Sequence, residues 1–63
     1  MTDELKRLWV IYGNLDAADN IISHTCMDAY KLKDQEIIDM MDNLSIQIET
    51  VYHKVMDRIE ASE

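Results

Sequence analysis

The side chains of this chain best suited to nucleophilic or metal chemistry are Cys26, His24 and His53. A cysteine nucleophile needs a histidine base within hydrogen-bond reach. Each residue turns a helix by about 100°, so positions 24 and 26 point about 200° apart and His24 cannot serve Cys26. Zinc sites need three or four converging ligands, and His53 lies in another part of the chain. We therefore expect no metal site or cofactor within one copy, and Cys26 as a small core residue. A metal shared between two copies is the remaining alternative.

The acidic residues offer a second kind of chemistry, because two carboxylates can act together as general acid and base. Their helical spacing is instead typical of a solvated face, formed by Asp39, Asp42, Glu49, Asp57 and Glu60. The single glycine in the sequence excludes a glycine-rich phosphate loop. The sequence therefore predicts a protein that is not an enzyme.

Two helices are predicted to position these side chains. Apolar residues recur at steps of three and four, which is the coiled-coil repeat and not a strand alternation, and the chain contains no proline. The stripe of the first helix contains Leu5, Leu8, Tyr12, Leu15, Ile22, Cys26 and Ala29. The stripe of the second helix contains Ile37, Met41, Leu44, Ile48, Val51 and Val55. We predict an all-α antiparallel two-helix hairpin, a single domain over residues 1–63 with helices at about 3–31 and 33–61.

The turn is predicted from the phase of the repeat. Extending the first stripe beyond Cys26 would place Lys33 and Glu36 in the seam between the helices, whereas the second stripe begins at Ile37. A slip of one residue rotates the apolar face by about 100°, so one continuous helix is disfavoured. A turn near residues 31 and 32 removes the mismatch.

In the predicted hairpin, residues that face each other have numbers that sum to 63, as in Leu8 with Val55. Asp19 falls in this seam opposite Leu44, so we expect it to be a buried polar residue, although desolvating a carboxylate is costly. It could open the seam locally or fix its register, as a buried asparagine does in coiled coils. Alternatively, it forms a polar pocket with Asp16 that accepts a basic group from a partner.

One flank of the predicted seam is apolar, and a two-helix hairpin has no means of covering it. Burying apolar surface stabilises by about 25 cal/mol per Å². A second hairpin is therefore expected to dock there and complete a four-helix bundle, most simply a twofold homodimer. The residues predicted at this dimer interface are Ile11, Ala18, Thr25, Ile38, Ser45 and Tyr52.

The length, the central turn and the expected four-helix bundle make the whole chain resemble the Rop-type helical hairpins of plasmid copy-number control. The resemblance implies a dimer and a regulator that binds RNA through a basic and aromatic face of the first helix. In this chain the outer face of the first helix carries Lys6 as its one strong positive charge. No RNA-binding residue is therefore carried over.

Apolar residues also lie outside the predicted seam, on the first helix. Glycine costs about 1 kcal/mol relative to alanine in a helix interior, yet small residues four apart let another helix approach closely. Tryptophan is a frequent anchor of protein interfaces. The residues predicted to bind a partner protein are Trp9, Val10, Gly13, Ala17 and Ile21. The alternative is that this strip is the far side of a bundle core or consists of scattered surface residues.

Composition narrows the class of function. The formal net charge of −7 is opposite in sign to that of most nucleic-acid binders, and no apolar segment is long enough to span a membrane. We expect a cytoplasmic location. The leading hypothesis is a small inhibitor or modulator that occludes a partner protein, as in many phage, plasmid and regulatory systems. The alternatives are a Rop-like RNA-binding regulator, an acidic mimic of nucleic acid that blocks a DNA-binding protein, and a structural segment of a larger assembly.

Overall fold

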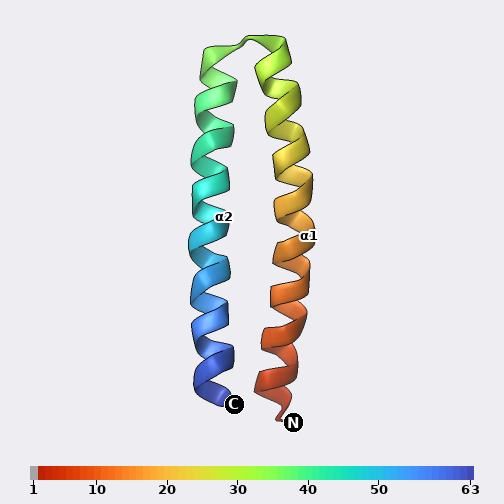
Figure 1. Cartoon of the computed structure of the whole chain (residues 1–63), viewed down its shortest axis with the longest axis vertical. Helices are drawn as coiled ribbons and strands as arrows, with labels where there is room; N and C mark the ends of the chain where they lie inside the picture. The colour runs from red at the N-terminus through yellow and green to blue at the C-terminus, as the bar shows by residue number, and fades with distance from the viewer. Residues whose placement is uncertain (1) are drawn as a thin grey trace.

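The chain folds into two long antiparallel helices. In a computed structural model, which describes residues 2–63, α1 spans Asp3–Leu32 and α2 spans Gln35–Ser62. The helices lie side by side along their length, and the start of α1 and the end of α2 lie at the end opposite the turn (Figure 1). The hairpin is a rod of 46 × 15 × 12 Å. The predicted all-α helical hairpin is confirmed.

Side chains cap both helices at their N-termini. Thr2 Oγ1 accepts a hydrogen bond from the backbone N–H of Leu5 at 3.1 Å, and Asp34 Oδ1 accepts one from the N–H of Ile37 at 3.2 Å. Each bond satisfies a donor that the first turn of a helix leaves unpaired. Because Asp34 is the cap, α2 begins at Gln35, two residues later than predicted.

The turn is made by Lys33 and Asp34. Lys33 has a φ of 62°, in the left-handed region, and its N–H donates to the carbonyls of Ala29 and Tyr30, both at 3.2 Å. This conformation costs a non-glycine residue roughly 1–2 kcal/mol, and helices that end this way usually place glycine there. Here Lys33 adopts the strained position, so the turn forms without the glycine or proline that usually marks one in a sequence.

The helices pack through residues spaced three and four apart. All residues of the predicted α1 stripe are buried or half-buried, so this half of the seam is confirmed. On α2 the seam consists of Ile38, Met41, Ser45, Ile48, Tyr52, Val55 and Ile59. The prediction is wrong at three α2 positions, because Ile37, Leu44 and Val51 are 39%, 41% and 49% exposed.

Aromatic packing accounts for the one-residue displacement on α2. The rings of Tyr12 and Tyr52 lie 4.7 Å apart, and the Tyr52 hydroxyl donates a hydrogen bond to the Tyr12 hydroxyl at 2.5 Å. This contact requires Tyr52, and not Val51, to face α1. Ile38 and Ile59 lie on the same side of α2 as Tyr52 and are also buried. The apolar surface of α2 is wide enough for either edge to face α1, and the tyrosine pair selects one edge.

The hairpin has a small interior. Ala29, Ile38, Val55 and Ile59 are its buried hydrophobic residues, and no large side chain within residues 2–63 is fully buried. Twelve large hydrophobic side chains are exposed in the same part of the chain. Much apolar surface thus lies outside the contact between the two helices.

Candidate functional site

Each side of the seam forms a long flank made by both helices, and the two flanks differ in character. Residues seven apart lie on one side of a helix that packs in this way. The polar flank carries Trp9, Asp16, Ser23 and Tyr30 of α1 and Asp42, Glu49, Met56 and Glu63 of α2. The apolar flank carries Ile11, Ala18, Thr25 and Leu32 of α1 and Ile37, Leu44 and Val51 of α2.

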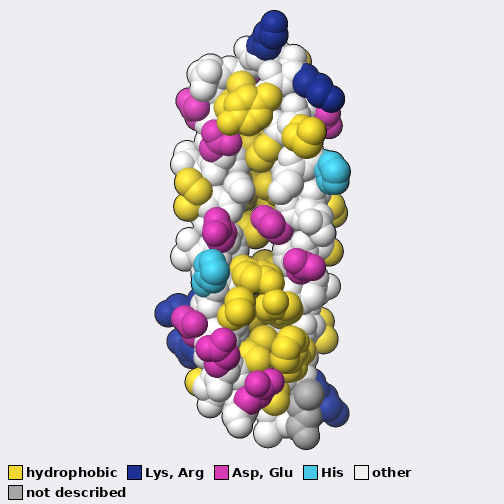
Figure 2. Space-filling model, in the orientation of Figure 1, with side chains coloured by type: hydrophobic (Ala, Val, Ile, Leu, Met, Phe, Trp, Pro, Cys, Tyr) yellow, Lys and Arg dark blue, Asp and Glu magenta, His cyan; other side chains and the backbone are white. Residues whose placement is uncertain are grey.

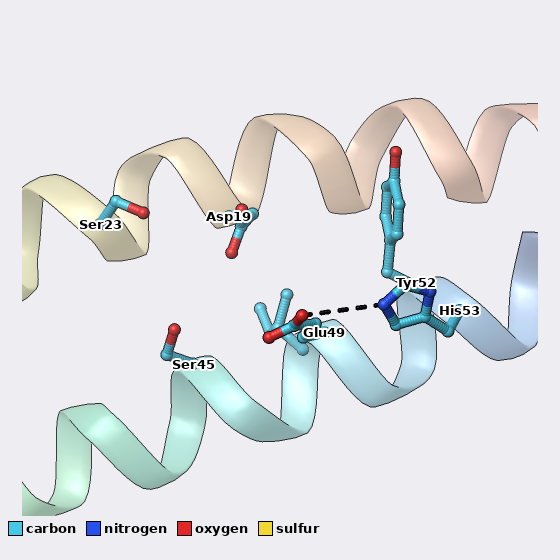
Figure 3. Close-up of a pocket in the computed structure, with 7 residues that line it drawn as sticks. Asp19, Ser23, Ser45, Glu49, Tyr52 and His53 are labelled. Atoms are coloured by element: carbon cyan, nitrogen blue, oxygen red, sulfur yellow. Dashed lines mark ion pairs between the residues drawn. The ribbon is translucent and has the colours of Figure 1, made fainter.

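The polar flank is hollowed at its middle by an open pocket of about 430 Å³. Asp19 points from α1 toward α2, whereas Ser45 and Tyr52 point from α2 toward α1 (Figure 3). His53 Nε2 lies 3.7 Å from Glu49 Oε1 at the rim, and both side chains are about two-thirds exposed (65% and 69%). Such an exposed pair contributes little stability.

Asp19 is half-buried in this pocket, so the prediction of a buried polar residue is wrong. The physical reason is its neighbour across the seam. The predicted neighbour was Leu44, but the small Ser45 lines the pocket and leaves the Asp19 carboxylate open to water. Acidic and histidine side chains gather around the middle of this face, between two groups of hydrophobic side chains (Figure 2).

Two tyrosines, Tyr52 in the seam and Tyr30 on the polar flank, are held in their protonated form. The hydrogen bond to Tyr12, with partial loss of solvent and nearby negative charge, raises the pKa of Tyr52 to about 12. The Tyr30 hydroxyl donates to the Asp42 carboxylate at 3.3 Å, and the charge of that carboxylate raises the pKa of Tyr30. Neither hydroxyl is a base or nucleophile at neutral pH. The flank therefore offers carboxylates and hydrogen-bonding groups to a partner.

The predicted interface anchor Trp9 lies beside the seam. Its ring packs edge-on against Tyr12, with ring centroids 5.6 Å apart. Together with Met56 and Ile59 it lines a small pocket of about 200 Å³ at the open end of the hairpin. Because Trp9 is 42% exposed, part of the ring remains available to a partner.

The other four residues predicted to bind a partner lie together on the outer face of α1. Val10 is 61% exposed and Ile21 is 66% exposed, and Gly13 and Ala17 lie between them. A side chain at Gly13 would meet open space, since nothing lies within 4 Å of its Cβ position. No contact within the hairpin therefore requires glycine there. The structure brings four of the five residues onto one face and leaves Trp9 apart.

The residues predicted at the dimer interface are divided between two surfaces. Ile11, Ala18 and Thr25 lie on the apolar flank, where the prediction placed them. Ile38, Ser45 and Tyr52 face α1 in the seam, because α2 is rotated by one position from the predicted seam. The sequence prediction missed the α2 half of the apolar flank, which is Ile37, Leu44 and Val51. The spacing of seven between these residues could have indicated that they share one side of α2.

The candidate nucleophile and metal ligands are not brought together as a site. Cys26 is half-buried, and its Sγ lies 3.9 Å from the backbone carbonyl oxygen of Met41. His24 is exposed on α1. Within residues 2–63 no three His, Cys, Asp or Glu side chains are grouped so that they could hold a metal. Neither helix is long and apolar enough to cross a membrane.

The fold and its surfaces define a class of protein: an all-α helical hairpin with one polar and one apolar flank. Comparison with protein-family models, with curated proteins and with solved structures finds no match.

Proposed function

We propose that the chain is a small acidic interaction module of the cytoplasm. It forms a homodimeric four-helix bundle and binds another protein, acting as an inhibitor or modulator that occludes a surface of that partner. The observation that carries the proposal is the distribution of apolar side chains. Twelve large hydrophobic residues are exposed, against four buried hydrophobic residues. Several of them share the apolar flank, and exposed apolar surface gathered on one side of a protein marks interaction sites.

The exposed area supports self-association. The hairpin exposes 5001 Å², whereas a compact monomer of 7.4 kDa exposes about 4,200 Å². The excess of about 800 Å² equals what each partner contributes to an interface of standard size. A second copy offers a surface of the same length and the same apolar character, and twofold pairing is the commonest arrangement of identical chains.

The outer face of α1 supports binding of a different protein, because Val10, Gly13 and Ala17 point away from both the seam and the apolar flank, and Ile21 lies between them and that flank. Val10 and Ile21 provide exposed aliphatic contacts, and the open space at Gly13 allows the close approach of a helix. The net charge of −7 favours encounter with a basic partner.

A binding comparison between matched variants tests this proposal. Ile21→Asp alters the outer face of α1 and Trp9→Ala alters the predicted anchor beside the seam, whereas Asn43→Ala alters an exposed position on the outer face of α2. A partner captured from the host by the wild-type protein is purified, and its affinity for each variant is measured. Loss of an interface anchor should weaken binding by at least tenfold, with Asn43→Ala unchanged. Wild-type affinity in both Trp9→Ala and Ile21→Asp refutes the proposed surface.

A second candidate function is supported by the polar flank. Asp16, Asp42 and Glu49 place carboxylates along one side of the rod, and a row of carboxylates can replace the phosphates that a DNA-binding protein recognises. Binding to such a target should weaken steeply between low and physiological salt. Binding through the apolar outer face should weaken much less over the same range, because salt screens only the long-range attraction to a basic partner. A salt titration of the purified complex distinguishes the two candidates, and a direct RNA-binding assay tests the Rop-like alternative.

A further inference from the structure

The apolar flank is a continuous strip with a defined centre and charged ends. Ala18 is its smallest side chain and lies near the middle of α1. Ile11, Ile37, Leu44 and Val51 are between 39% and 49% exposed. These side chains thus pack partly against the seam of their own hairpin and leave the rest of their apolar surface exposed to solvent.

We propose that a second copy of this chain docks on the apolar flank in one orientation, with its turn beside the open end of the first hairpin. Two reciprocal ion pairs, Arg7 with the partner's Asp28, select this orientation. The inference rests on the proposed homodimer and adds to it the surface, the orientation and the residues that specify them.

Two twofold arrangements can place one apolar flank against another. In the first, the axis crosses the rod, the turns lie at opposite ends, and α1 packs against α1 of the partner. In the second, the axis runs along the rod, the turns lie together, and α1 packs against α2 of the partner. All neighbouring helices are antiparallel in both arrangements, so helix dipoles do not distinguish them.

The charges at the edge of the flank distinguish the two arrangements. Arg7 comes four residues before Ile11, and Asp28 comes three residues after Thr25, so both lie on the outer edge of the flank on α1. They lie about 15–17 Å on either side of Ala18 at 1.5 Å per residue. A crossing axis at Ala18 therefore brings Arg7 beside the partner's Asp28, and this happens twice in the dimer.

The arrangement with turns together creates repulsion instead. Trp9 lies level with Met56 and Glu60 at the open end of the hairpin. Arg7 is therefore level with Arg58 along the rod. Arg58 comes seven residues after Val51, so it lies on the same side of α2 as the apolar flank. With the turns together, Arg7 meets the partner's Arg58, again twice. Like charges placed opposite each other disfavour this arrangement.

A charge exchange tests the ion pairs. Arg7→Glu and Asp28→Lys are made singly and together, and the dimer dissociation constant is measured by sedimentation at low salt. Either single change converts two attractions into two repulsions, so each should weaken the dimer about tenfold. The double variant should return to within about twofold of the wild type. A tighter dimer in Arg7→Glu, or no recovery in the double variant, overturns the proposal.

Disulfide trapping tests the orientation without relying on charge. In a Cys26→Ser background, Ala18→Cys should form an intermolecular disulfide readily, because the two copies of position 18 meet at the crossing axis. The arrangement with turns together predicts cross-linking only when Ala18→Cys is combined with Val51→Cys. That result overturns the orientation but leaves the homodimer standing. A wild-type protein that stays monomeric at all concentrations overturns the proposed homodimer itself.

Discussion

Replacing Asp19 by leucine should stabilise the protein, because the carboxylate occupies half-buried space in the seam. Burying a leucine side chain fully stabilises by about 1.5–3 kcal/mol. Asp19 is half-buried beside Ile48 and Tyr52, so about half of this, roughly 1 kcal/mol, is expected from burial.

Asp16→Leu is the matched control. Asp16 lies one turn away and is exposed. Both variants remove one negative charge and gain the same helix propensity, a few tenths of a kcal/mol, so the difference between them isolates burial in the pocket. The assay is thermal unfolding followed by circular dichroism at one protein concentration, since the stability of a dimer depends on concentration.

The midpoint of Asp19→Leu should exceed that of Asp16→Leu by about 4–8 °C, the shift expected for 1 kcal/mol in a domain of this size. Equal midpoints, or a lower one for Asp19→Leu, would contradict the half-buried position of Asp19. Binding of a purified partner by the same variant separates the two readings of the pocket. If Asp19→Leu still binds the partner, Asp19 acts only in the packing of the seam. If Asp19→Leu is more stable but no longer binds, the pocket is part of the partner-binding site.

Three further predictions concern the turn, the tyrosine pair and the outer face. Lys33→Gly should stabilise by about 0.5–1 kcal/mol in urea unfolding, because glycine relieves the left-handed strain at some entropic cost, whereas Lys31→Gly in the last turn of α1 should destabilise. Tyr12→Phe should lower the pKa of Tyr52 from about 12 toward 10 in an ultraviolet titration, since the hydrogen bond from Tyr52 to Tyr12 is its largest cause. The raised pKa stabilises the wild type below pH 10 and this contribution is lost as the pH rises through 12, so the variant should lose less stability over that range. Gly13→Ala should raise the free energy of unfolding by about 1 kcal/mol and weaken binding of a partner that approaches α1 closely; unchanged stability would contradict the open space at Gly13.

Periodicity was sufficient to predict the hairpin and the seam residues of α1. The α1 stripe keeps steps of three and four from Leu5 to Ala29, and this regular spacing identified its buried side. The break of heptad phase between Cys26 and Ile37 located the turn to within two residues. The exact turn was not predictable, because a lysine adopts a conformation that usually requires glycine.

The seam of α2 could not be chosen from its sequence, because apolar residues occupy adjacent positions. Ile37 and Ile38 suit the seam equally well by pattern, and so do Val51 and Tyr52. The choice depends on the contact between Tyr52 and Tyr12, forty residues apart in the chain. This rotation by one position placed Ile38, Ser45 and Tyr52 in the seam and not at the predicted dimer interface. It also placed the small Ser45 near Asp19, which is therefore only half-buried. The contact between Tyr12 and Tyr52 thus accounts for both wrong predictions.

The molecular mass in solution is the most direct test of the claim that a second copy covers the apolar flank. Sedimentation equilibrium at micromolar concentration should give twice 7.4 kDa for the wild-type protein. It should give 7.4 kDa and lower helicity for Leu44→Asp, which places a charge on the flank. A fully helical wild-type monomer, or a Leu44→Asp dimer as tight as the wild type, would contradict the claim.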